Sequence, residues 1–208
     1  MQYAPEFFTL ALLHLLAVMS PGPDFALISR NSLLYSRRTG VYSALGIALG
    51  ILVHVTYSLI GIGLVIASSP FLFALIQYSG AAYLLYLGVR SFVSSSANDT
   101  LGTATGHDLS VAEAVRSGFL TNALNPKASL FFLSVFSQVV KPSTPTALKV
   151  LYGLEMSVVT FLWFAAVALV LSHSSLRKRF ARAQPMVAKI MGVVLILLGL
   201  RVAFAHTG

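Results

Sequence analysis

The sequence predicts an all-α polytopic membrane protein with six transmembrane helices, arranged as two inverted three-helix repeats whose first helices, spans 1 and 4, are broken at Pro. Three observations predict this fold: an apolar composition, six apolar stretches of membrane-spanning length, and a matched break in the first and fourth stretches. Of the 208 residues, 57% are apolar and 10% are charged, whereas soluble domains have about 45–50% and about 25%. So little charge cannot cover the surface of a soluble globule, and a disordered chain would be more polar.

Each of the six apolar stretches is long enough to cross a bilayer, which takes about 20 residues. Pro, Ser, Gly or basic residues mark the links between them, as in turns. The third link, residues 94–114, is polar and separates residues 1–93 from residues 115–208 within one membrane domain. No basic residue precedes Arg30 and no small-residue cleavage site follows the first stretch, so we expect a permanent helix there. The predicted spans are residues 7–29, 42–67, 70–92, 115–139, 148–172 and 186–206.

The Lys and Arg residues, 14 in all, fall mainly on one side of the predicted membrane. An excess of Lys and Arg marks the cytoplasmic side, so we expect the first, third and fifth links in the cytoplasm and both termini in the periplasm. The net charge of +8 then suits anionic lipid better than nucleic acid. The cytoplasmic set is Arg30, Arg37, Arg38, Arg90, Arg116, Arg177, Lys178, Arg179, Arg182 and Lys189, against Lys141, Lys149 and Arg201 on the other side.

Two pairs of similar motifs indicate an internal repeat. Leu87-Gly88-Val89-Arg90 near the end of the third span resembles Leu198-Gly199-Leu200-Arg201 near the end of the sixth. Pro21-Gly22-Pro23-Asp24 interrupts the first span, and Asn125-Pro126-Lys127 interrupts the fourth. Because each half has an odd number of helices, the second half crosses the membrane in the opposite sense. Inverted repeats of this kind are an architecture of secondary transporters.

The two breaks predict helix starts near the middle of the membrane. Pro inside a helix removes a hydrogen bond, and in a membrane such a break is tolerated where it lines a cavity. Pro23 and Pro126 suit the first position of a new half-helix, after Gly22 and Asn125. A helix N-terminus carries about half a positive charge and free N–H donors. Two such ends that meet at one cavity favour an anionic group, such as a carboxylate.

Two charged residues directly follow the breaks. Asp24 and Lys127 would each cost several kcal/mol facing lipid, so we expect both to face the interior. Together they complement a zwitterionic α-amino acid: Lys127 and the amides near Gly22 and Asn125 would hold its carboxylate, and Asp24 its ammonium group. The alternative is a purely structural pair in which Lys127 neutralises Asp24.

Other polar residues of the spans are candidates for coupling or for lining the cavity. Glu155 and His54, like Asp24, are candidates for carrying protons, because such side chains exchange protons near neutral pH when they are buried. For both His54 and His14, a packing role is the favoured alternative. We expect Asn122, Tyr57 and Thr121 to line the cavity, and close helix contacts at Gly46, Gly50, Gly61 and Gly63.

Several chemistries lack their sequence signals. The chain has no G-x-x-x-x-G-K-[ST] loop for ATP, no H-E-x-x-H motif and no Cys, so we expect no catalytic residue, no metal and no cofactor. A membrane enzyme would need a nucleophile such as Ser20 beside His14 or His54, and no recognised spacing supports it. The driving force would then be an ion or substrate gradient.

Two segments resemble the signatures of the LysE/RhtB superfamily of amino-acid exporters: Met19-Ser20-Pro21-Gly22-Pro23-Asp24 and residues 118–128, which read Gly-Phe-Leu-Thr-Asn-Ala-Leu-Asn-Pro-Lys-Ala. The resemblance covers essentially the whole chain. It implies a bacterial inner-membrane carrier that exports amino acids with the proton motive force. The first signature and Ser134-Val135-Phe136-Ser137 look closest to the threonine and homoserine branch.

The resemblance leaves the substrate class and the assembly open. The charges of Asp24 and Lys127 sum to zero, which matches a neutral amino acid. A basic substrate is the alternative and would use Glu155 as the additional acid, and a scaffold that transports nothing is a further alternative. The expected partners are an amino acid, protons and the lipid bilayer, with a homo-oligomer left open.

Overall fold

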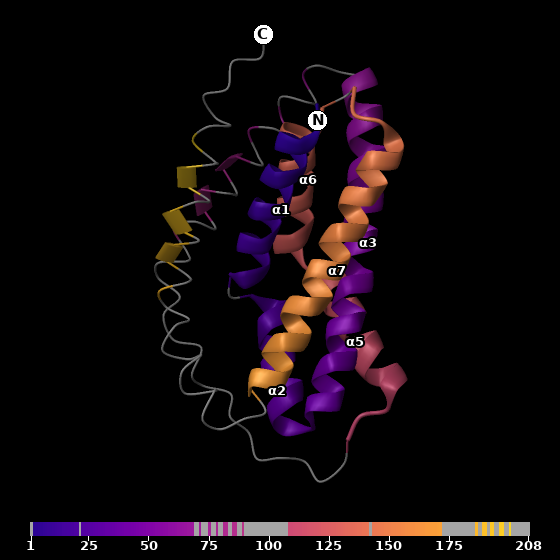
Figure 1. Ribbon diagram of the computed structural model, residues 1–208, viewed down its shortest axis with the longest axis vertical. Helices are drawn as coiled ribbons and strands as arrows, with labels where there is room; N and C mark the ends of the chain where they lie inside the picture. Colours follow the sequence, from indigo (N-terminus) through magenta and orange to yellow (C-terminus); the bar gives the residue numbers. More distant parts are fainter. Residues whose placement is uncertain are drawn as a thin grey trace.

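The computed structural model describes residues 2–20, 22–68, 108–141 and 143–171, together with scattered residues between 71 and 89 and between 186 and 200. The described part of the chain contains six helices and no strand (Figure 1). They are α1 (Ala4–Met19), α2 (Pro23–Leu34), α3 (Arg37–Ser68), α5 (Val111–Ala123), α6 (Pro126–Val139) and α7 (Thr146–Leu171).

Helices α3 and α7 are each long and apolar enough to cross a membrane, over Arg37–Gly61 and Thr146–Leu171. They confirm the helices predicted at residues 42–67 and 148–172. Helices α1 and α2 qualify as a third span when they are taken together, as one segment bent by 53°. Lys127–Val139 is an apolar helix shorter than a span. The chain is therefore a multi-pass membrane protein. The spans predicted at residues 70–92 and 186–206, which contain the Leu-Gly-x-Arg motifs, lie mostly outside the described residues.

Local sequence explains where the shorter helices begin. At α5, the Ser110 hydroxyl accepts a hydrogen bond from the Glu113 amide at 3.3 Å, and the Ser110 amide donates to the Glu113 carboxylate at 2.9 Å. This capping box satisfies two amides that the first turn leaves without partners. Helices α2 and α6 both begin with Pro. Pro suits this position because it lacks the backbone N–H, which would have no acceptor within the helix in the first turn. The Asn125 side chain caps α6 by accepting from the Lys127 amide at 3.0 Å.

The helices are arranged around α3, which contacts α2, α5, α6 and α7. Figure 1 shows α3 and α7 running the length of the bundle, with α1 and α6 in its upper half and α2 and α5 in its lower half. Helix α1 contacts α6, and α2 contacts α5. The N-terminal ends of α2 and α6 therefore come to the same middle level of the bundle, one running down from it and the other up (Figure 1).

Small residues let α3 and α5 approach each other closely. A Cβ atom on Gly46 would overlap the Val115 carbonyl oxygen, and one on Gly118 would overlap the Ser43 carbonyl oxygen. The predicted close contacts therefore occur at Gly46 and Gly50, whereas a Cβ atom at Gly61 would have no described atom within 4 Å. The surroundings of Gly63 lie outside what the structure describes.

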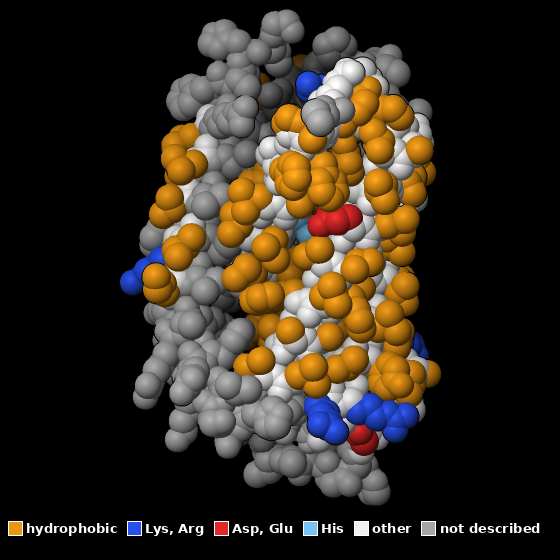
Figure 2. Space-filling view, in the orientation of Figure 1, with side chains coloured by type: hydrophobic (Ala, Val, Ile, Leu, Met, Phe, Trp, Pro, Cys, Tyr) orange, Lys and Arg blue, Asp and Glu red, His pale blue; other side chains and the backbone are white. Residues whose placement is uncertain are grey.

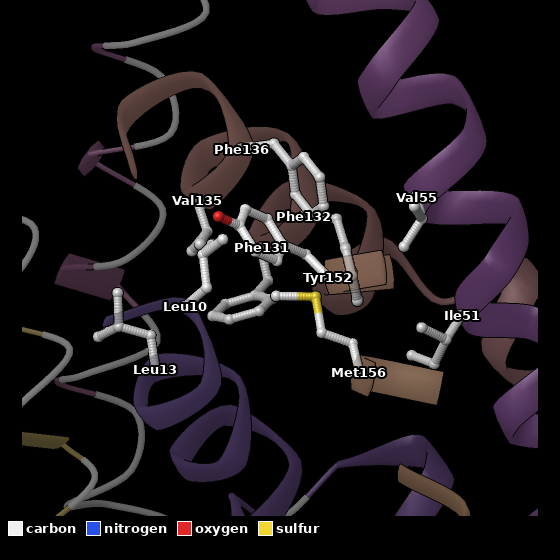
Figure 3. Close-up of a cluster of buried hydrophobic side chains, with 10 residues drawn as sticks. All are labelled: Leu10, Leu13, Ile51, Val55, Phe131, Phe132, Val135, Phe136, Tyr152 and Met156. Atoms are coloured by element: carbon white, nitrogen blue, oxygen red, sulfur yellow. The ribbon is translucent and has the colours of Figure 1, made fainter. Parts of the chain in front are cut away.

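Two apolar clusters fill the bundle on either side of its middle. The upper cluster joins α1, α3, α6 and α7 (Figure 3), and the lower cluster joins α2, α3 and α7. The upper cluster comprises Leu10, Leu13, Ile51, Val55, Phe131, Phe132, Val135, Phe136, Tyr152 and Met156. The lower cluster comprises Ile28, Ala44, Ile47, Phe164, Val167, Ala168 and Leu171.

The outer surface has the distribution expected of a chain surrounded by lipid. Figure 2 shows a broad apolar face with Lys and Arg side chains gathered at the lower end of the bundle. Helix α2 ends and α3 begins at that end of the bundle, and Arg30, Arg37 and Arg38 are exposed there. Large apolar side chains such as Phe8 and Leu162, which are 68% and 59% exposed, face outward. In water such a face would be unstable, whereas lipid tails accept it.

Candidate functional site

A cavity lies between the upper and lower clusters and is lined by residues from both helix starts. Its volume is about 40 Å³, which is room for a few water molecules at about 10–15 Å³ each. Part of the polar lining comes from the ends of α1 and α5 and the first turns of α2 and α6, and Phe25, Phe131, Phe132 and Phe164 supply apolar walls. The polar lining residues from these helix ends and first turns are Ser20, Asp24, Asn122, Asn125 and Lys127.

The Asp24 carboxylate is held by the opposite pair of helices. Its Oδ2 atom accepts hydrogen bonds from the side-chain amides of Asn122 at 2.9 Å and Asn125 at 3.3 Å. Its Oδ1 atom is buried and accepts no hydrogen bond from the described groups. Asp24 also lies in the first turn of α2, where the helix dipole favours a negative charge. One oxygen of the carboxylate is thus fixed, and the other remains available in the cavity wall.

The Lys127 ammonium group is held by the end of α1. Its Nζ atom donates to the carbonyl oxygen of Ser20 at 3.0 Å. Its positive charge also attracts the negatively charged Asp24 carboxylate. The side chain passes close to Gly22, where a Cβ atom would stand 3.2 Å from Nζ and 3.3 Å from Cδ. Gly22 therefore leaves room for the lysine. Each charged residue is held by groups beside the other residue's break.

His54 lies behind the cavity wall and holds the end of α5. Its buried ring places Nε2 2.8 Å from the Asn122 carbonyl oxygen, and Nδ1 2.8 Å from the Tyr57 hydroxyl. Because a carbonyl oxygen only accepts hydrogen bonds, Nε2 carries a proton. Nδ1 then accepts from the Tyr57 hydroxyl, and on the other side of the break the Ser129 hydroxyl donates to the Asn125 carbonyl oxygen at 3.2 Å. His54 therefore connects α3 to the end of α5.

The remaining predicted residues lie in different places. Gly22, Asn122 and Asn125 line the cavity with Asp24 and Lys127, whereas Pro23, Tyr57, His54, Thr121 and Glu155 are not among its lining residues. Glu155 is half-buried on α7, with no hydrogen bond or ion pair to the described residues. The side chain of Pro126 and the placement of Pro21 lie outside the described residues. Within the described part, no cluster of His, Asp and Glu has the arrangement of a metal site.

Sequence reasoning favoured a packing role for His14 and missed Thr160, and the two residues form a polar pair in the cavity lining. His14 of α1 and Thr160 of α7 are buried, at 1% and 0% exposed, and His14 Nε2 lies 3.1 Å from the Thr160 hydroxyl. The signal that identifies Thr160 is its position on the buried stripe of α7, four residues after Met156 and four before Phe164. A polar residue on the interior stripe of an apolar helix marks a candidate site.

Comparison with known proteins gives the family. Residues 15–206 match the LysE type translocator family. The threonine efflux protein of Salmonella typhi is 32% identical over 179 residues, which is 85% of this chain and 86% of that protein. The threonine efflux protein of Escherichia coli strain K12 is 32% identical over 181 residues, with the same coverage. An uncharacterized membrane protein of Bacillus subtilis is 29% identical over 192 residues, 88% of this chain and 91% of the relative.

No solved structure matches the chain. The family match extends over far more than half of the sequence and includes both helix starts of the cavity. The chain therefore belongs to the LysE type translocator family, whose members are transporters and not enzymes.

Proposed function

We propose that this chain exports neutral amino acids, threonine and its close analogues among them, across the bacterial inner membrane in exchange for protons. The observation that carries the proposal is the pair of opposite charges in one cavity, each held by groups beside the other's helix break. The names of the two 32%-identical relatives described above, each a threonine efflux protein, support the substrate class.

The charges of the cavity suit both ends of an α-amino acid. The substrate carboxylate would bind Lys127 at the start of α6, where the helix dipole also favours an anion. The substrate ammonium group would bind Asp24 through Oδ1, the buried atom that accepts no hydrogen bond from the described residues. Because the two protein charges sum to zero, a neutral amino acid leaves no net charge behind. The alternative of a basic substrate needs a second acid, and Glu155 is not among the lining residues.

Protons would couple to transport through Asp24. In an apolar enclosure a carboxylate needs a compensating positive charge or a proton. When the substrate ammonium group leaves, a proton replaces it, and the carrier returns without substrate. The hydrogen-bonded side chains of His54 and Tyr57 lie directly behind Asn122 and offer a route for that proton. Glu155 remains a further candidate because it is an acid half-buried in a predicted span.

The cavity would open by movement of the two predicted repeats. Residues 1–93 and 115–208 would form inverted three-helix repeats joined by residues 94–114, with spans 1 and 4 broken at Pro. The paired positions of α1 with α6 and α2 with α5 support this arrangement (Figure 1). The cavity must widen to admit an amino acid, and rocking of one repeat against the other would open it at one cluster or the other. The basic lower end would face the cytoplasm, with both termini periplasmic.

The test uses purified protein in vesicles loaded with labelled threonine. We expect faster release when the external medium is more acidic than the lumen, and loss of release in Asp24→Asn and Lys127→Met. Asp108→Asn and Lys141→Met are the matched controls, because both residues are exposed and lie outside the cavity. Thermal unfolding in detergent checks that each variant is folded. A rate of threonine release from wild-type vesicles that does not change with the pH gradient would refute proton coupling. Normal release by both site variants would refute the site.

A further inference from the structure

We propose that His14 and Thr160 form a second subsite of the cavity, which hydrogen-bonds a hydroxyl group on the substrate's side chain. The inference rests on the proposed amino-acid export and adds the residues that select among neutral substrates. Asp24 and Lys127 would bind the groups common to all α-amino acids, so they do not distinguish one side chain from another. Selection must come from other parts of the lining.

The position of the pair fits this role. His14 and Thr160 come from α1 and α7, and both line the same cavity as Asp24 and Lys127. The rings of Phe131 and Phe132 lie beside the His14 imidazole, with centroid distances of 6.4 and 5.9 Å. A side chain that enters this part of the cavity therefore meets apolar walls and one hydrogen-bonding pair.

The hydrogen bonds of the pair are incomplete. Nε2 of His14 interacts with the Thr160 hydroxyl at 3.1 Å, while Nδ1 is buried with no hydrogen-bond partner among the described residues. A neutral imidazole has one N–H donor and one acceptor nitrogen, and a hydroxyl group can both donate and accept. In one tautomer Nδ1 offers an acceptor and Thr160 keeps its proton for another group. In the other tautomer Nδ1 offers a donor.

Either tautomer leaves a buried group that a substrate hydroxyl completes and a methyl group does not. A site of this kind rejects the analogue that lacks the hydroxyl, because binding that analogue buries the polar groups without partners. A purely structural His14–Thr160 bond between α1 and α7 would instead affect all substrates equally. The ratio of two substrates separates these roles.

The experiment compares efflux of threonine with efflux of 2-aminobutyrate, which lacks the hydroxyl group. We expect the wild type to prefer threonine and Thr160→Val to lower that preference roughly tenfold, the effect of about one hydrogen bond. Thr160→Ser keeps the hydroxyl and should keep the preference. Ser157→Ala is the matched control: Ser157 lies one turn away on α7 and donates to the Ala48 carbonyl oxygen at 2.8 Å, outside the cavity lining.

The outcomes are separable. An unchanged ratio in Thr160→Val, or an equal loss of both substrates, would overturn the subsite. Thr160→Ala repeats the test if the valine variant does not fold. A wild type that releases neither amino acid would refute the proposed function itself, whereas a wild type with threonine efflux and no ratio change refutes the subsite alone.

Discussion

Gly50→Ala perturbs the cavity from outside and tests whether Asn122 sets the position of Asp24. Gly50 lies on α3 and does not line the cavity. A Cβ atom there would stand 2.7 Å from Asn122 Oδ1 and 2.9 Å from its Cβ, whereas ordinary contacts begin at 3.4 Å. Relief of the closer contact requires a movement of about 0.7 Å, the difference between 3.4 and 2.7 Å. The neighbour that must move is the residue that holds Asp24.

That movement is large on the scale of a hydrogen bond. The Asn122 amide donates to Asp24 Oδ2 at 2.9 Å. Lengthening by 0.7 Å gives about 3.6 Å, which is no longer a hydrogen bond, and shortening by as much is sterically forbidden. Hydrogen bonds to charged groups contribute about 1.5–3 kcal/mol. Loss of this bond should therefore lower threonine efflux roughly tenfold or more, since about 1.4 kcal/mol corresponds to a factor of ten.

The assay is vesicle efflux together with thermal unfolding, and Gly61→Ala on the same helix is the control. No atom of the described residues lies within 4 Å of a Cβ at Gly61, so Gly61→Ala should transport normally and gain up to about 1 kcal/mol of helix stability. The same gain partly offsets the strain in Gly50→Ala, so its transport should fall more than its stability. Equal efflux by the two variants would refute the reasoning that Asn122 positions Asp24.

Two further predictions concern the ends of the bundle. In Thr144→Val the buried Glu6 carboxylate loses the hydroxyl that lies 2.9 and 3.0 Å from its oxygens, which should cost about 1–3 kcal/mol and lower the Tm measured in detergent; an unchanged Tm would contradict it. In the segment before α5, hydrogen bonds from Ser36 and Thr39 hold the pKa of Asp108 below its ordinary value of 3.8. A lowered folded-state pKa adds stability above the unfolded-state pKa that is lost as the pH falls through the folded-state pKa. The Tm of the wild type should thus fall more steeply below about pH 4 than that of Asp108→Asn, and parallel curves would disprove the effect.

The elements of the fold were predictable because lipid imposes a simple rule on sequence. Apolar stretches of sufficient length gave α3 and α7, and Pro beside a small or capping residue gave the starts of α2 and α6. The boundaries were less predictable, since helices continue past the apolar core. Helix α5 begins at Val111 rather than residue 115, because Ser110 and Glu113 form a capping box in the polar link.

The sequence predicted the two charges of the candidate site and part of its lining, but not how the charges are held. The sequence indicated that Asp24 and Lys127 belong to the interior, but hydropathy does not say which groups hold them. It also does not fix the rotation of a helix that is apolar on all sides. Glu155 and Met156 are adjacent, yet about 100° of rotation separates them, so Met156 is fully buried and Glu155 is not. Thr160 shares the buried stripe with Met156, and that is why it lines the cavity.

The reciprocal hold on the two charges constrains how the proposed exporter moves. Asp24 depends on Asn122 and Asn125 of the second break, and Lys127 depends on Ser20 of the first. Separating the breaks without a replacement leaves buried charges unpaired, which costs about 3–5 kcal/mol. A bound amino acid supplies both replacements, a carboxylate for Lys127 and an ammonium group for Asp24. After release only Asp24 can be neutralised by a proton, so the return of the carrier without substrate is the step that should depend on the proton gradient.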